Sequence, residues 1–180
     1  MKVVIIGGVA GGATAAARLR RLDEHAEIVI LERSGYVSYA NCGLPYYIGG
    51  TIQSQSALTL QTPDSFRSRF NIDVRVQSEA TAVDPQAHTV TVRDLRSGTE
   101  YTETYDKLIL SPGARAIRPP LPGVDSERIY TLRTVEDTLR IRQVVETQRP
   151  QSAIVVGGGF IGLEMAENLM HAGLHTTLIQ

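Results

Sequence analysis

The sequence predicts an α/β fold, because two stretches each combine a short apolar strand, a glycine turn, a helix and a second strand. The first stretch covers residues 3–31 and the second covers residues 153–179. A unit of about 30 residues is the size of a crossover between parallel strands. Between the two units, alternating polar and apolar residues predict a small antiparallel meander.

The elements of each unit follow from hydrophobic pattern and helix propensity. In both units a buried parallel strand is followed by a helix and then by a second strand. The expected ranges are Val3–Ile6, Ala13–Asp23 and Glu27–Leu31 in the first unit, and Ala153–Val156, Ile161–His171 and Thr176–Ile179 in the second.

The region between the units contains strands, a linker and a helix. Antiparallel strands are expected at His88–Asp94 and Thr99–Tyr105, around a turn at residues 96–98, and a buried strand at Lys107–Leu110. The run SPGARAIRPPLPG predicts an extended crossover, because its prolines disfavour regular structure. A helix is expected at Thr134–Gln148, ending before the proline at position 150.

Composition excludes several classes of function. The 180 residues carry a net charge of -1 without any basic run, which argues against nucleic-acid binding. One cysteine rules out an internal disulfide framework and a multi-cysteine metal site, so no metal is expected and a reducing, cytoplasmic compartment fits best. The apolar N-terminal stretch is similar to a signal peptide, but four glycines interrupt its apolar run. No segment of the sequence reaches membrane-spanning length.

The second glycine turn predicts a phosphate-binding site. Gly157, Gly159 and Gly162 form a complete G-x-G-x-x-G motif between a strand and a helix, where a pyrophosphate can meet the helix N-terminus. Gln180 stands eighteen residues after Gly162, where such units often place an acid. A neutral amide does not repel a 2'-phosphate, so NADPH is permitted beside NADH.

The first glycine turn is a variant of the same motif. Gly7 and Gly12 keep the outer positions, while Val9 occupies the middle position. Glu32 follows Gly12 by twenty residues, at the end of the second strand, where a carboxylate can bind ribose hydroxyls. The alternative is that the glycines only permit tight turns and that Glu32 is a solvated acid.

Cys42 is the candidate reactive residue. Gly43–Ile48 predicts a short helix with Pro45 in its first turn, which would place the thiol at a helix N-terminus. The positive end of a helix favours the thiolate, which is the nucleophilic form. The alternative, common for a lone cysteine, is a small buried apolar side chain.

Four segments resemble those of one enzyme family. The run SYANCGLPYY around Cys42 resembles the active-site segment of coenzyme A-disulfide reductases and their persulfide-reductase relatives, which are class III pyridine nucleotide-disulfide oxidoreductases. IIGGVAGGATAAARLRRLDE resembles the FAD-binding start of that family, and YDKLILSPGA its flavin-side strand and loop. VVGGGFIGLEMAENL resembles its nicotinamide-nucleotide site.

The resemblance implies a Rossmann-like, three-layer FAD/NAD(P)-binding fold with an antiparallel meander and a truncated second nucleotide-binding unit. Residues 1–112 would be the first segment of an FAD-binding domain, residues 113–150 a crossover linker and helix, and residues 151–180 the start of an NAD(P)-binding domain. The chain would then be the N-terminal part of a longer protein, for which the resemblance implies a homodimer.

The resemblance also implies the cofactors and the residues that contact them. Bound FAD would take hydride from NADPH or NADH. The implied FAD contacts are Gly7, Gly8, Val9, Ala10, Gly11, Gly12, Glu32, Arg33, Ala80, Ser111, Pro112 and Gly113. The implied nicotinamide-nucleotide contacts are Gly157, Gly159, Phe160, Ile161, Gly162 and Gln180.

The implied reaction is reduction of a small coenzyme A-type disulfide or persulfide by Cys42, the catalytic residue. The residues matching the family's substrate contacts are Thr14, Arg18, Arg21, Ser38 and Asn41. Arginines suit phosphate groups, although Arg18 and Arg21 could equally be solvated, as is expected for the neighbouring Arg20.

Two other functions remain open. One is an NADH oxidase or peroxidase in which Cys42 cycles through a sulfenic acid. The other is a nucleotide-binding module without catalysis, and the isolated 180 residues are expected to be inactive.

Overall fold

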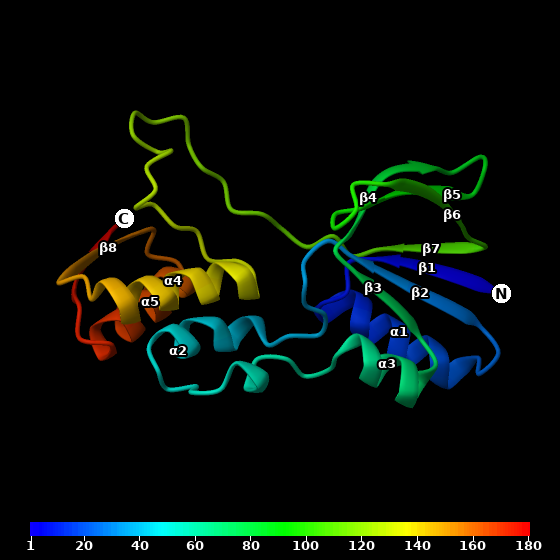
Figure 1. Ribbon diagram of the computed structural model, residues 1–180, viewed down its shortest axis with the longest axis horizontal. Coiled ribbons are helices and arrows are strands. Elements are labelled where there is room, and N and C mark those ends of the chain that lie inside the picture. Colours follow the sequence, from blue (N-terminus) through cyan, green and yellow to red (C-terminus); the bar gives the residue numbers. More distant parts are fainter. The chain divides into compact units, whose positions relative to one another are not determined.

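The computed structural model describes residues Met1–Gln180, which form two compact units. The first unit contains Met1–Tyr39 and Thr59–Ala114, and the second contains Ala40–Leu58 and Arg115–Gln180. The segment Ala40–Leu58, which carries Cys42, therefore groups with elements that lie far from it in the sequence. Figure 1 shows the elements of each unit.

A four-stranded parallel sheet forms the centre of the first unit, with the strand order β3-β2-β1-β7. The expected strands near the N-terminus and before the linker are confirmed. The bounds are β1 (Lys2–Ile6), β2 (Glu27–Glu32), β3 (Asp73–Val76) and β7 (Lys107–Leu110). β1 lies between β2 and β7, so both of its edges are hydrogen-bonded.

Both faces of this sheet are covered, which confirms the three-layer fold. Val3 and Ile5 pack in one apolar cluster with helices α1 (Ala10–Leu22) and α3 (Pro63–Phe70). The alternate residue Val4 packs in a second cluster with the antiparallel meander. Figure 1 shows the helices on one side of the sheet and the meander on the other. Strands in this position are buried on both faces, which explains their continuous apolar sequence.

The meander has three strands in the order β4-β5-β6. Their bounds are β4 (Ser78–Asp84), β5 (Thr89–Asp94) and β6 (Glu100–Thr104). The turn expected at residues 96–98 is confirmed, and Gly98 adopts a φ of 74° there. Sequence patterning had indicated only β5 and β6, because β4 lacks a regular alternation.

Two expectations for the first unit need correction. Helix α1 begins at Ala10 rather than at Ala13, because Gly11 and Gly12 are helical despite their low propensity. The strand Lys107–Leu110 exists but is not buried, since Lys107 and Leu110 are exposed and Leu110 retains 64% of its accessible surface. As β7, it lies at the edge of the sheet and pairs only with β1.

Helix α3 and strand β3 were not predicted. Thr62 caps α3 in a reciprocal capping box with Ser65, and Asn71 ends the helix in the left-handed region at a φ of 49°. Phe66 on this helix is 2% exposed and fills the core beneath the sheet. The run Thr-Pro-Asp-Ser at residues 62–65 is a helix-start pattern that could have identified it.

The second unit packs three helices and a two-stranded parallel sheet. Its elements are α2 (Leu44–Ile48), α4 (Val135–Gln148), β8 (Ser152–Val156), α5 (Phe160–His171) and β9 (His175–Ile179). Ile48, Ile141, Met165, Leu169 and Leu174 form the core. The expected strands and helices are confirmed within one to two residues, and residues 111–121 form the extended crossover that the prolines indicate.

A buried carboxylate fixes the meander to the sheet in the first unit. Glu103 on β6 is 7% exposed and pairs with Lys2 on β1 and with Arg75 on β3. Arg75 also pairs with Asp73 at 2.8 Å. Burial would raise the pKa of the Glu103 carboxyl, but hydrogen bonds from Lys2 and Arg75 and their charges hold that pKa below its ordinary value.

Glu103→Gln is expected to lower the free energy of unfolding at pH 7 by about 1–3 kcal/mol, because it leaves two partly buried cations without their shared carboxylate. Because the folded pKa of Glu103 lies below the ordinary value of about 4.3, the wild-type advantage is present at neutral pH and disappears as the pH falls through the folded value.

Urea unfolding of the wild type and of Glu103→Gln between pH 7 and pH 3 measures this difference in stability. Glu100 lies on the same strand as Glu103 and makes an exposed ion pair with Arg93 of β5, so Glu100→Gln is the control and should change stability by less than about 0.5 kcal/mol. An equal effect of both substitutions would contradict the network's role.

None of the helices is long and apolar enough to cross a membrane.

Candidate functional site

The first glycine turn connects β1 to α1 through two positions that only glycine can occupy. Gly7 has a φ of 95°, and a Cβ on it would lie 2.0 Å from the carbonyl oxygen of Ser111. A Cβ on Gly12 would lie 1.8 Å from the carbonyl oxygen of Gly7. Val9 is tolerated because it only precedes the helix as its N-cap. The outer glycines of the motif are therefore required by the turn itself.

The second glycine turn repeats this geometry between β8 and α5. Gly157 has a φ of 106°, and a Cβ on Gly162 would lie 1.8 Å from the carbonyl oxygen of Gly157. The Gly157 amide donates to the Ile179 carbonyl at 2.8 Å, just as the Gly7 amide donates to that of Leu31 at 2.8 Å. Gly159, the middle glycine, has no atom within 4 Å of its Cβ position. The backbone at Gly159 is thus open to a ligand.

Helix capping distinguishes the two helices that follow glycine turns from α3 and α4. α3 and α4 begin with capping boxes built on Thr62 and Thr134, and both have acidic residues in their first turn. α1 and α5 have no side-chain cap and no acid in the first turn. Their free amide groups and positive dipole ends are suited to an anionic group such as a pyrophosphate.

Glu32 and Gln180 occupy equivalent positions at the ends of the second strands. The Glu32 side chain is buried, and its two oxygens accept from the amides of Gly8 and Ser34, each at 2.8 Å. The Gln180 side-chain oxygen accepts from the amide of Gly158. Spacing predicted both residues, but the contact with the second glycine of each turn is visible only in the structure.

The loop after β7 closes over the first turn. The Ser111 amide donates to the Ile6 carbonyl at 2.7 Å, and the Ser111 hydroxyl oxygen would lie 3.2 Å from a Cβ on Gly11. Pro112 and Gly113 follow as exposed residues, and Gly113 has a φ of 71°. The structure therefore brings Ser111 together with Gly7, Gly11 and their turn, as expected for one binding site.

Arg33 and Ala80 have other contacts. Arg33 is largely exposed and pairs with Glu79 at 3.7 Å. Ala80 on β4 packs against the core between the sheet and the meander. These contacts give both residues a structural role. That Arg33 and Ala80 also contact FAD stays a prediction.

Cys42 is a free, exposed thiol. The alternative of a buried apolar cysteine is therefore wrong. It lies in the 3-10 turn η1 (Asn41–Gly43), directly before α2, whose first turn contains Pro45. The expected helix at Gly43–Ile48 is confirmed, with its start one residue later. The side-chain oxygen of Asn41, the residue before Cys42, is buried and accepts no hydrogen bond, so this turn contains an unsatisfied polar acceptor.

Three of the predicted substrate residues share one face of α1. Thr14, Arg18 and Arg21 are exposed at i, i+4 and i+7. The expectation that Arg20 is solvated is wrong, because its guanidinium donates to the carbonyls of Phe70, Asp23, Glu24 and Asn71 and so joins the ends of α1 and α3. Ser38 has a φ of 48°, and its amide donates to the Gly8 carbonyl at 2.9 Å.

Comparison with known proteins gives one family over the whole chain. The profile of the family described as pyridine nucleotide-disulphide oxidoreductase matches residues 1–180. The coenzyme A disulfide reductase of Staphylococcus haemolyticus is 44% identical over 178 residues, which is 99% of this chain and 40% of that protein. The chain thus spans less than half the length of the curated relatives that it matches.

Solved structures agree with this result. The crystal structure of reduced Bacillus anthracis CoADR-RHD has a TM-score of 0.96 and 49% identity, covering 98% of this chain and 32% of that one. The NAD-dependent persulfide reductase from A. fulgidus has a TM-score of 0.93 and 38% identity, covering 99% and 34%. The water-forming NADH oxidase from Lactobacillus brevis has a TM-score of 0.91 and 30% identity, covering 99% and 39%.

Proposed function

Because this chain belongs to the pyridine nucleotide-disulphide oxidoreductase family, we propose that the protein is an FAD-dependent NAD(P)H oxidoreductase. Its substrate would be coenzyme A disulfide or a related small disulfide or persulfide, reduced through Cys42. The observation that carries the proposal is the exposed thiol of Cys42, in a turn with an unpartnered Asn41 oxygen, in a chain with two uncapped glycine-turn helices. The likeness to coenzyme A disulfide reductase and to the persulfide reductase supports this choice of substrate class.

The first turn would hold FAD. The residues fit this group, because the uncapped N-terminus of α1 offers amide groups to the pyrophosphate and the buried carboxylate of Glu32 keeps lone pairs for ribose hydroxyls. Gly7–Gly12 and Ser111–Gly113 would line the site, with Arg33 and Ala80 as further contacts. Bound FAD would supply electrons from NAD(P)H to the sulfur of Cys42.

The second turn would bind the nicotinamide nucleotide. Gly159 leaves its backbone open, and Phe160 and Ile161 are exposed at the start of α5. Gln180 would contact the adenosine ribose or its 2'-phosphate, since Glu32 occupies the equivalent place in the first unit. Because an amide does not repel a phosphate, both NADPH and NADH are accepted.

Gln180→Glu is expected to weaken NADPH binding by about tenfold while leaving NADH binding within about twofold, because a carboxylate repels the 2'-phosphate and accepts from ribose hydroxyls. Fluorescence titration of the full-length protein with each nucleotide measures the ratio. Glu32→Gln, the matching change in the first unit, is the control and should leave this ratio unchanged. If Gln180→Glu weakens both nucleotides equally, Gln180 does not discriminate between them.

The chemistry at Cys42 is thiol–disulfide exchange. The thiolate attacks one sulfur of the substrate, a mixed disulfide forms, and the other half leaves as a thiolate. Two electrons that come from NAD(P)H would then cleave the mixed disulfide, which would release the second half as a thiolate and restore the Cys42 thiolate. These 180 residues contain one cysteine and cannot form an internal disulfide among themselves, so the mixed disulfide would be the oxidised state of Cys42.

Substrate binding and assembly complete the proposal. Ser38 and Asn41 would contact the substrate beside the sulfur, and Thr14, Arg18 and Arg21 would bind its phosphates from the exposed face of α1. Residues 1–112 would form the first segment of the FAD domain, residues 113–150 the crossover, and residues 151–180 the start of the NAD(P) domain. The full-length protein would be a cytoplasmic homodimer.

The test is oxidation of NADPH and NADH by the full-length protein with coenzyme A disulfide as acceptor, followed at 340 nm. Nucleotide oxidation that requires the disulfide supports the proposal. If the protein contains FAD but oxidises neither nucleotide in the presence of the disulfide, the proposal is wrong.

An NADH oxidase or peroxidase is the second candidate, favoured by the likeness to the water-forming NADH oxidase and by an exposed single cysteine that can form a sulfenic acid. Nucleotide oxidation that needs oxygen or peroxide, without any disulfide, would favour it. A third outcome, nucleotide binding without turnover, would indicate a non-catalytic nucleotide-binding module, as is expected for the isolated 180 residues.

A further inference from the structure

Arg142 on α4 binds the segment that carries Cys42. One guanidinium nitrogen, Nη1, donates to the carbonyls of Tyr47 at 2.9 Å and of Ile52 at 3.1 Å. The guanidinium carbon lies 4.0 Å from the centre of the Tyr47 ring, within the range of a cation–π interaction. The side chain is 18% exposed, and its Nε pairs with Glu146 at 2.6 Å. Arg142 thus joins the C-terminal end of α2 to the loop that follows it.

Helix α5 holds the same end of α2 from a second direction. A Cβ on Gly49, the residue after α2, would lie 2.5 Å from the side-chain oxygen of Asn168. Asn168 is 3% exposed, and its amide nitrogen donates to the Glu164 carbonyl at 2.8 Å. The helix that begins at the second glycine turn therefore approaches Gly49 so closely, at Asn168, that no side chain would fit at this position.

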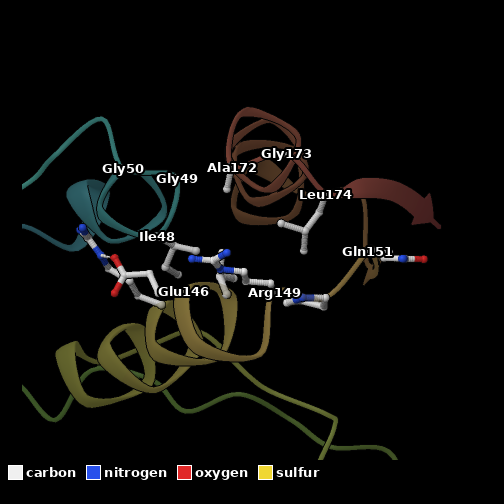
Figure 2. A pocket seen from close by; sticks show the side chains of 12 residues that line it. Ile48, Gly49, Gly50, Glu146, Arg149, Gln151, Ala172, Gly173 and Leu174 are labelled. Carbon is white, nitrogen blue, oxygen red and sulfur yellow. Dashed lines mark hydrogen bonds and ion pairs between the residues drawn. The ribbon is translucent and has the colours of Figure 1, made fainter.

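The remaining side of this junction is open. Figure 2 shows a groove bordered by Ile48, Gly49 and Gly50, by Glu146 and Arg149 of α4, and by the end of α5 at Ala172–Leu174. Its volume is about 700 Å³. Gly50 has a φ of 84° and no atom within 4 Å of its Cβ position. Ile48 at the end of α2 is itself buried in the core of this unit, so its packing and the hydrogen bonds of Arg142 together hold this end of the helix.

We propose that Arg142 is a positioning residue for Cys42. Cys42 stands directly before α2, a helix of only five residues, so the placement of the thiol depends on how α2 is held. Arg142 holds the far end of that helix and acts on the reaction through it. The effect of Arg142 on turnover rests on the proposed function. Its effect on the local stability of the Cys42 segment does not depend on that function.

The test compares Arg142→Met with two controls in the full-length protein. Arg140→Met removes an exposed arginine of the same helix, which stacks on Tyr130 outside the cysteine segment. Glu146→Gln removes the Nε partner but leaves the two carbonyl hydrogen bonds. Arg142→Lys keeps a cation that can donate to the two carbonyls but loses the planar group over Tyr47 and the Nε contact with Glu146, so it serves as a partial-rescue variant.

Hydrogen exchange gives the first readout, and it needs neither FAD nor substrate. The amides of Gly43, Gly49 and Ile52 donate to the carbonyls of Ala40, Pro45 and Tyr46, each at 3.0 Å. Arg142→Met should speed their exchange by about tenfold or more, while Arg140→Met and Glu146→Gln leave it within about twofold. Unchanged exchange at Gly43 in Arg142→Met would overturn the proposal, because loosening would then not reach the cysteine turn.

Steady-state kinetics gives the second readout. Arg142→Met should lower kcat for disulfide reduction by about tenfold with the KM for NADPH unchanged, and Arg142→Lys should restore part of this loss. An equal loss of kcat in Arg140→Met would overturn the proposal. If the wild-type protein reduces no disulfide, the proposed function fails, and the exchange at Gly43 still decides the role of Arg142.

Discussion

Cys42→Ser is expected to lower disulfide reduction by at least about a thousandfold, because serine cannot form the mixed disulfide through which the electrons pass. Cys42 is the one cysteine among these 180 residues, so no other thiol of this chain can replace it. Steady-state turnover of NADPH with coenzyme A disulfide, in the full-length protein, measures the loss.

The same variant should keep its cofactors. The glycine turns, Glu32 and Gln180 are built from hydrogen bonds and contacts in which Cys42 takes no part. Flavin content and nucleotide affinity should therefore equal those of the wild type. Disulfide reduction that survives in Cys42→Ser would show that another group performs the exchange.

Gly162→Ala is expected to have the largest effect on stability, about 3 kcal/mol, because its Cβ would lie 1.8 Å from the backbone oxygen of Gly157. No side chain can move to relieve this contact, so either the turn or the start of α5 must shift. Gly159→Ala is the matched variant from the same motif. Its Cβ would meet no atom within 4 Å, so the fold should tolerate it.

The two variants separate the two roles of glycine in the motif. Gly159→Ala should leave the unfolding temperature nearly unchanged but weaken nucleotide binding by about tenfold, because the Cβ fills the space that the pyrophosphate approaches. Thermal unfolding and nucleotide titration of the full-length variants measure both quantities. If Gly159→Ala destabilised the protein as much as Gly162→Ala, the assignment of structural and binding roles would be wrong.

The glycine turns were predictable because the motif is local. A turn from a parallel strand into a helix needs a positive φ at Gly7 and Gly157 and a close approach at Gly12 and Gly162, and these needs fix the spacing in the sequence. The continuous apolar runs of the central strands β1 and β2 are also read from neighbouring residues alone. The sequence therefore predicted the α/β class, both turns and the positions of Glu32 and Gln180.

Contacts between distant segments were not predictable. Arg20 resembles any surface arginine in the sequence, yet it binds carbonyls at residues 70 and 71. Arg142 forms an ordinary i, i+4 pair with Glu146, and nothing local indicates its bonds to Tyr47 and Ile52. The grouping of Ala40–Leu58 with α4 and α5 depends on such contacts, so patterns of neighbouring residues do not indicate it.

The visible absorption spectrum of the purified full-length protein tests the central claim, which is that the Cys42 thiolate lies against a bound flavin and receives electrons through it. The spectrum should show the yellow bands of oxidised FAD with a long-wavelength charge-transfer shoulder that disappears in Cys42→Ser. Flavin bands that are identical in the wild type and in Cys42→Ser would contradict it, because the sulfur would then have no electronic contact with the flavin.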